Sequence, residues 1–166
     1  TMVVSQRPVF TCSESAASNF GNESSKRDAL CAGSAGLANS VVSTLPPRER
    51  ELVILRIGWL CRSEYEWGQH VLIGRRAGLT DEEIRRIKEP LSTEGWSELD
   101  QAMLRAVDEL HSEAFISDPT WKTLSSHLST QQLLDLIFAV GQYNLVSMAL
   151  NTLGVQRDEG VPGFDI

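Results

Sequence analysis

Almost every residue between Leu52 and Leu60 is apolar, so a helix through this segment has no polar face. A surface helix shows an apolar stripe, whereas a helix that is apolar all round must be buried on most sides. The preceding Thr44-Leu45-Pro46-Pro47 predicts a helix start, because threonine caps helices and proline is tolerated in the first turn. We therefore expect a helix from Pro47 to about Cys61 at the centre of the fold.

Five further helices are predicted from their capping residues and their helical spacing of apolar residues. Their caps are Ser63 with Gly78, Thr80, Ser97, Ser117 or Asp118, and Ser129 with Gly154. Ser63 and Glu66 have the spacing of a capping box. Since no segment alternates with the two-residue period of a strand, the expected fold class is all-α.

The chain of 166 residues fits one domain with a single core. Residues 1–42 are interpreted as an irregular arm with a weak helix, 43–157 as a helical domain, and 158–166 as a C-terminal tail. The last helix is long and apolar, but polar residues such as Asp135 and Gln142 interrupt it. Because a membrane span needs ~20 predominantly apolar residues, we expect a protein core or a subunit interface there, and no membrane.

The formal charge of -7, with no basic stripe, makes nucleic acid and anionic membranes poor partners and favours a small-molecule substrate. Three widely spaced cysteines form neither a disulfide framework nor a metal site, so no metal is expected. Such cysteine usage favours a reducing compartment. Because no secretory signal is recognisable at the start of the sequence, a cytoplasmic location is expected.

Glu66 and His70 are four residues apart, so on a helix they share one face. Their apolar neighbours suggest that the pair is partly buried. Burial and mutual charge shift the pKa values of both groups, so either group can titrate near neutrality. The pattern therefore indicates a proton-transfer pair, although a surface ion pair or a buried structural histidine has the same spacing.

Four segments resemble the carboxymuconolactone decarboxylase family: Leu45–Arg56, Glu64–His70, Ala77-Gly78-Leu79 and Asn151–Val155. The resemblance covers about residues 43–157, and the superfamily also contains the alkylhydroperoxidase-D peroxidases. It implies an all-helical fold with a central two-helix hairpin. It also implies assembly as homotrimers or homohexamers, with the substrate sites near the subunit interfaces.

The peroxidase branch of this superfamily uses a Glu, eleven intervening residues, and then Cys-x-x-Cys-x-x-x-His. In this sequence the pattern falls on Glu51, Ser63, Glu66 and His70, so both thiol positions are lost. Cys61 has no resolving cysteine three residues away, so a thiol–disulfide cycle is not expected. The resemblance leaves Glu51, Glu66 and His70 as an acid/base set that suits decarboxylation or isomerisation through an enol, without a cofactor.

In this interpretation His70 protonates the enolate, and Glu51 or Glu66 orients the imidazole or shuttles the proton. Candidate substrate-binding residues surround this set and comprise Arg56, Tyr65, Trp67, Ser63, Cys61 and Asn144. Most have a structural alternative: Arg56 can pair with an acid, the two aromatic residues can belong to the core, and Cys61 can be a small buried residue. Asn144 forms a polar stripe with Ser147 and Asn151, which suits a substrate site or a subunit interface.

Two other functions stay open at this stage. The first is a peroxide-consuming protein that uses Cys61 alone through a sulfenic acid. The second is a non-catalytic small-ligand binder in which the acids and the histidine form a structural buried network.

Overall fold

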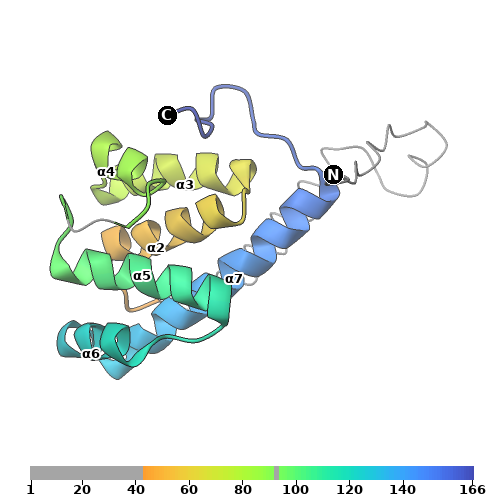
Figure 1. Ribbon diagram of the computed structural model, residues 1–166. Coiled ribbons are helices and arrows are strands. Elements are labelled where there is room, and N and C mark those ends of the chain that lie inside the picture. The colour runs from red at the N-terminus through yellow and green to blue at the C-terminus, as the bar shows by residue number, and fades with distance from the viewer. Residues whose placement is uncertain (1–42, 92–93) are drawn as a thin grey trace, which may run out of the picture. The chain divides into compact units, whose positions relative to one another are not determined.

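The computed structural model describes residues 43–91 and 94–166, and all regular structure in these ranges is helical (Figure 1). The helices are α2 (Pro47–Leu60), α3 (Glu64–Ala77), α4 (Asp81–Arg86), α5 (Glu98–Glu113), α6 (Asp118–His127) and α7 (Thr130–Leu153). The expected all-α class is therefore confirmed, and each helix predicted after residue 43 is present. The weak helix expected before residue 43 lies outside the described residues.

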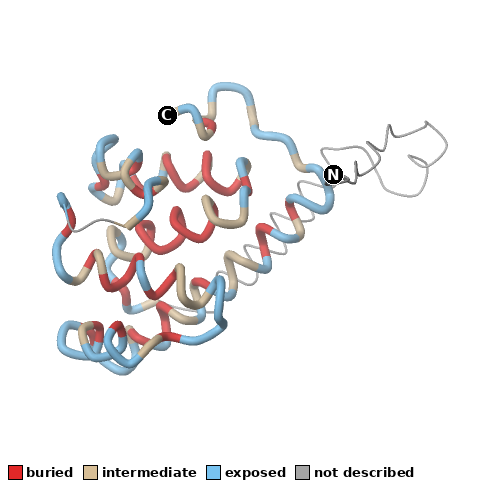
Figure 2. The backbone as a smooth tube through the Cα atoms, viewed as in Figure 1, coloured by how far each residue is buried: buried red, intermediate tan, exposed pale blue. Residues whose placement is uncertain are grey.

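Helix α2 is the central helix of this fold, as its composition predicts. It lies between α3 and α5, and α7 crosses its side (Figure 1). All eight residues from Glu51 to Gly58 are buried, which Figure 2 shows as red turns in the middle of the bundle. Burying each of its large aliphatic side chains contributes roughly 2 kcal/mol to stability, so α2 is anchored from every side.

The segment before α2 binds α7 through hydrogen bonds and does not cap the N-terminus of α2. Pro46 is the N-cap residue of α2, and no side chain caps this end. The backbone N–H and the hydroxyl of Thr44 instead donate to the Asp135 carboxylate, at 2.5 and 2.7 Å. The predicted capping role of Thr44 is therefore wrong, because the buried carboxylate on α7 takes both of its donors.

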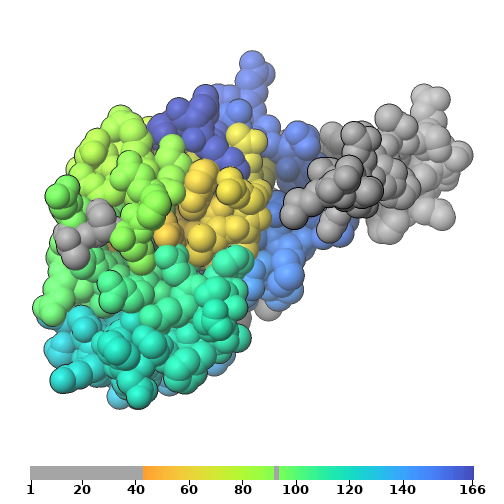
Figure 3. Space-filling model, in the orientation of Figure 1, coloured from red at the N-terminus to blue at the C-terminus, as the bar shows by residue number. Residues whose placement is uncertain are grey.

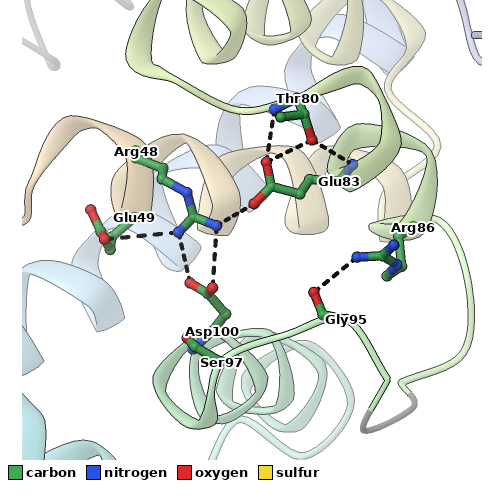
Figure 4. A network of polar contacts seen from close by, with 8 residues as sticks. All are labelled: Arg48, Glu49, Thr80, Glu83, Arg86, Gly95, Ser97 and Asp100. Carbon is green, nitrogen blue, oxygen red and sulfur yellow. Dashed lines mark hydrogen bonds and ion pairs between the residues drawn. The ribbon is translucent and has the colours of Figure 1, made fainter.

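Arg48 joins the start of α2 to α4 and α5 (Figure 4). Its guanidinium donates to both oxygens of Asp100, at 2.9 and 3.2 Å, and also binds Glu83. Glu83 is the third residue of α4 and closes the predicted capping box with Thr80. One side chain thus holds three helix starts together.

The C-terminal segment 155–166 packs on the outer side of α3, as the dark blue surface in Figure 3 shows. The Trp67 indole donates to the Gly163 carbonyl at 3.0 Å. Phe164 packs edge-on against Trp59, with ring centroids 5.1 Å apart. The fit is close enough that a Cβ on Gly68 would collide with the Pro162 carbonyl oxygen. The C-terminal segment thus contacts both helices, α3 through Trp67 and α2 through Trp59.

Helix α7 has the length and composition of a membrane span, a property it shares with long core helices of soluble proteins. One side of α7 is buried against the bundle and includes the polar residues Asp135 and Ser147. The other side exposes large apolar side chains, namely Leu134, Phe138, Leu145 and Met148. This second side has no partner among the described residues.

Candidate active site

The site is built on the hairpin of α2 and α3, which a three-residue turn connects. Arg62 in this turn has a φ of 54°, a left-handed conformation that reverses the chain tightly. Glu51 lies near the start of α2, and His70 lies in the second turn of α3. Because short loops make neighbouring helices antiparallel, the hairpin brings these two distant residues together.

His70 lies between two carboxylates. Its Nδ1 is 2.6 Å from Glu51 Oε2, and its Nε2 is 3.0 Å from Glu66 Oε1. The three side chains are almost fully buried, with 2% of Glu51, 9% of His70 and 10% of Glu66 exposed. The three residues predicted to carry the chemistry are therefore in direct contact, and Glu51 is at the buried end. Glu51, His70 and Glu66 together form the relay.

Burial alone would lower the pKa of His70, because it disfavours the imidazolium. The hydrogen bonds that His70 donates to the Glu51 and Glu66 carboxylates, together with the negative charges of these carboxylates, outweigh burial and raise the pKa of His70 to about 9. An imidazolium between two carboxylates is the consequence at neutral pH. Each of its N–H groups then donates a charge-assisted hydrogen bond.

Tyr143 on α7 closes one side of the relay. Its ring packs edge-on against the His70 ring, with centroids 4.9 Å apart and an interplanar angle of 85°. Burial and the negative charges of Glu66 and Glu51 raise the pKa of Tyr143, so its phenol stays neutral. The Tyr143 side chain, which packs on the imidazole, therefore carries a neutral hydroxyl donor.

Ser63 is the N-cap residue of α3, but its hydroxyl caps nothing. The predicted capping box with Glu66 is wrong, because the Glu66 carboxylate binds His70 instead of turning back to the helix start. The Ser63 side chain is fully buried, and its Oγ has no hydrogen-bond partner among the described residues. Ser63 and Glu66 thus replace the two thiols of the peroxidase pattern with a hydroxyl and a carboxylate.

Cys61 connects this turn to α7. Its thiol donates to Asn144 Oδ1 at 3.1 Å, and its backbone carbonyl accepts a hydrogen bond from Asn151 at 2.8 Å. Burial raises the pKa of the Cys61 thiol, and the neighbouring Ser147 hydroxyl offsets this only in part. Two members of the predicted polar stripe on α7 therefore bind the hairpin turn.

Arg56 does not take part in the relay contacts. Its guanidinium binds both oxygens of Asp108, each at 2.7 Å, and also the carbonyls of Ile87 and Glu89. The ion pair considered for Arg56 from the sequence is thus its observed arrangement, with Asp108 as the acid. These four bonds link α2 to α5 and to the segment after α4.

The two aromatic candidates on α3 are placed differently. Trp67 is fully buried beneath the C-terminal segment, where it packs with Trp59 and Phe164. Tyr65 is partly buried near the start of α3. Trp67 therefore belongs to the core beneath the C-terminal segment.

Sequence reasoning did not assign a role to Tyr143 or Arg50. Arg50 Nε lies 3.3 Å from Glu51 Oε1, at the buried end of the relay. Tyr143 lies four residues before Ser147 and so on the same face of α7, which is the signal that would have found it. In the described ranges, no group of histidine, cysteine and acidic side chains is arranged to hold a metal ion.

The sequence model of the carboxymuconolactone decarboxylase family matches residues 28–109, which include both hairpin helices and all three relay residues. The chain belongs to this family. Family membership and the helical hairpin confirm the resemblance found in the sequence. No curated protein matches the chain.

The decarboxylase-family fold is also found in a crystal structure from Agrobacterium tumefaciens, of a protein of unknown function considered a candidate antioxidant defence protein, AhpD. The two chains are 21% identical, and the match has a TM-score of 0.68. It covers 80% of this chain and 90% of the other. At this identity the likeness shows a common fold. A common fold does not establish a common activity, which depends on the residues of the site.

Proposed function

We propose that this family member is a cofactor-independent lyase or isomerase. It would act on a small oxygenated organic acid, lactone or related metabolite in the cytoplasm, and the relay would perform general acid/base chemistry. The observation that carries the proposal is His70 held at both ring nitrogens by buried carboxylates, 2.6 and 3.0 Å away. A network that already contains a mobile proton between fixed groups is suited to moving that proton to and from carbon.

The geometry gives each relay residue a different task in this proposal. Both nitrogens of His70 are engaged, so the group that meets the substrate is Glu66, which binds the ring nitrogen opposite the one held by the more deeply buried Glu51. His70 supplies a proton to Glu66 or withdraws it, and Glu51 holds the imidazole and its charge at the buried end. Glu66 is thus the catalytic residue, and His70 and Glu51 act through it.

A peroxidase function that depends on Cys61 is supported less well. The thiolate is the reactive form of cysteine, and burial raises the pKa of Cys61 and so disfavours that form. The thiol also donates a hydrogen bond to Asn144, which favours its protonated form. Reactive cysteines instead have a lowered pKa and an electropositive environment.

The proposal predicts opposite results for Glu66→Gln and Cys61→Ser. Small lactones and β-keto acids would be screened in D2O by NMR for decarboxylation and carbon–hydrogen exchange. Glu66→Gln keeps the shape of the side chain but removes its basicity, so the rate should fall by about 10²-fold or more. Cys61→Ser should keep the rate within about twofold, because a hydroxyl can still donate to Asn144.

An unchanged rate in Glu66→Gln would show that the relay is a structural network and the protein a non-catalytic binder. Peroxide consumption by the wild type that disappears in Cys61→Ser would instead establish the antioxidant function. Both variants should bind a substrate analogue if they fold correctly, which separates loss of chemistry from loss of structure.

We also propose that the protein is a homotrimer or homohexamer that covers the exposed side of α7 with a second copy. Phe138 is 62% exposed, and Leu145 and Met148 are more than half exposed on the same helix. Contiguous apolar surface of this kind marks an interface.

The matched test of assembly is Phe138→Glu against Phe115→Glu. Phe115 is 63% exposed but lies after α5, outside the α7 surface. Light scattering should show a trimer or hexamer for the wild type and Phe115→Glu, and a smaller species for Phe138→Glu. Equal masses for the two variants would place the interface elsewhere.

A further inference from the structure

Within the described part of the chain, two buried side-chain hydroxyls have no hydrogen-bond partner. Ser63 and Ser147 are each 0% exposed, and the Oγ atoms of both have no partner among the described residues. The Ser147 hydroxyl lies near the Cys61 thiol but forms no hydrogen bond of ordinary geometry with it. A buried polar group without a partner costs free energy, so such pairs mark places where a ligand atom can bind.

Ser63 lies on the face of α3 that carries Glu66 and His70, and Ser147 lies on the face of α7 that contacts the hairpin turn. Ser63, Glu66 and His70 follow at spacings of three and four residues, so they share one face of α3. On α7, Asn144 and Asn151 both bind Cys61, and Ser147 lies between them on the same helical face. Ser147 therefore faces the turn that leads into Ser63, one helical turn from Glu66.

The positive charges of α2 and the following turn are already engaged. Arg56 binds Asp108, and Arg50 binds Glu51. Arg62 lies over the Trp59 ring, 4.9 Å from its centroid. A substrate carboxylate beside Glu66 would thus find no unengaged arginine on α2 or in the turn after it, all of whose residues the structure describes, but would find two negative relay groups.

We propose that Ser63 and Ser147 bind the carbonyl oxygen of a small uncharged lactone or ketone, whose α-carbon is then presented to Glu66. This inference rests on the proposed acid/base function and narrows its substrate to neutral carbonyl compounds. The favoured reaction is isomerisation of a β,γ-unsaturated carbonyl compound to the α,β-unsaturated form.

The reaction needs no further reactant. The Glu66 carboxylate takes a proton from the α-carbon, and the C–H electron pair moves into the new C=C bond as the carbonyl π pair moves onto oxygen. The resulting dienolate oxygen accepts hydrogen bonds from Ser63 and Ser147, which oppose its new charge. Glu66, supplied through His70, returns the proton to the γ-carbon while the carbonyl re-forms.

Two saturated lactones that differ at one position test the substrate class by binding. γ-Valerolactone carries a methyl group where 5-oxotetrahydrofuran-2-carboxylate carries a carboxylate. Ligand-observed NMR titration of the full-length protein should show at least about tenfold tighter binding of γ-valerolactone, equivalent to about 1.4 kcal/mol. Ser147→Ala should weaken that binding by about tenfold, since one hydrogen bond to the carbonyl is lost.

Thermal unfolding separates a binding role from a structural one. Ser147→Ala and Ser63→Ala remove hydroxyls that have no hydrogen-bond partner in the described ranges, so the Tm should stay the same or rise. The control is Ser97→Ala, because Ser97 does cap its helix by accepting from Asp100 N–H at 3.0 Å, and its loss should lower the Tm.

Equal or tighter binding of the carboxylate, or no binding of either lactone, would overturn the inference. A carboxylate affinity that is lost in Arg50→Gln would show that Arg50 is the carboxylate-binding group and also overturn it. Isomerisation of α-angelica lactone addresses the proposed function separately. Binding of γ-valerolactone that needs Ser147, without any isomerisation, would uphold the binding site and contradict the catalytic proposal.

Discussion

Replacing His70 with glutamine is expected to abolish turnover and to lower the free energy of unfolding by about 3–5 kcal/mol, the cost of breaking a buried ion pair. Among the residues that the structure describes, the imidazolium is the only cationic partner of Glu66, and it is also bound to Glu51. A glutamine cannot carry a proton between them, so the chemistry stops. It also leaves two buried carboxylates without the positive charge that compensates them.

The double variant Glu51→Gln/His70→Gln separates the loss of turnover from the loss of stability. It removes one carboxylate together with the imidazole, so less uncompensated charge remains buried, and part of the lost stability should return. Turnover should not return, because Glu66 is left without His70, the group that supplies and withdraws its proton. Urea unfolding measures the stability, and a turnover assay on the same preparations measures the activity. A double variant less stable than His70→Gln would show that the relay charges do not interact as proposed.

The helices were predictable because their signals are local. The capping box of Thr80 and the glycine caps Gly78 and Gly154 stand in the sequence beside the helices that they start or end. The contact of Glu66 with His70 was predictable for the same reason, since four residues of helix place both on one face. These inferences need no knowledge of the tertiary packing.

Contacts across helices were not predictable from spacing. Glu51 reaches His70 only because the hairpin folds back, and from the sequence this pairing came from the family resemblance. Trp67 has the position of a relay neighbour, but its indole binds Gly163 of the C-terminal segment, which lies 96 residues further along the chain and whose position the spacing of residues does not give. The predicted capping box failed because the Glu66 carboxylate binds His70, one turn further along the same helix, instead of turning back to the helix start.

The stability of the protein should fall as the pH rises from about 6.5 to 9. His70 has an ordinary pKa of 6.5 when unfolded and a pKa of about 9 when folded. The native state therefore binds the proton more tightly than the unfolded state in this window, and stability decreases with pH. The stabilising contribution of the protonated His70 is fully present below pH 6.5 and is lost as the pH rises through 9. Its size is about 3 kcal/mol, from about 1.4 kcal/mol for each unit of pKa difference.

Urea unfolding at intervals between pH 6 and 9 measures this slope, and two variants assign it. The Cys61→Ser background removes a thiol that also favours the unfolded state at high pH, because burial raises its pKa in the native state. In that background, Glu51→Gln/His70→Gln should make the stability nearly independent of pH across the window. A slope that survives in the double variant would mean that the imidazole between the two carboxylates is not protonated at neutral pH. The relay would then lack the stored proton with which Glu66 is supplied.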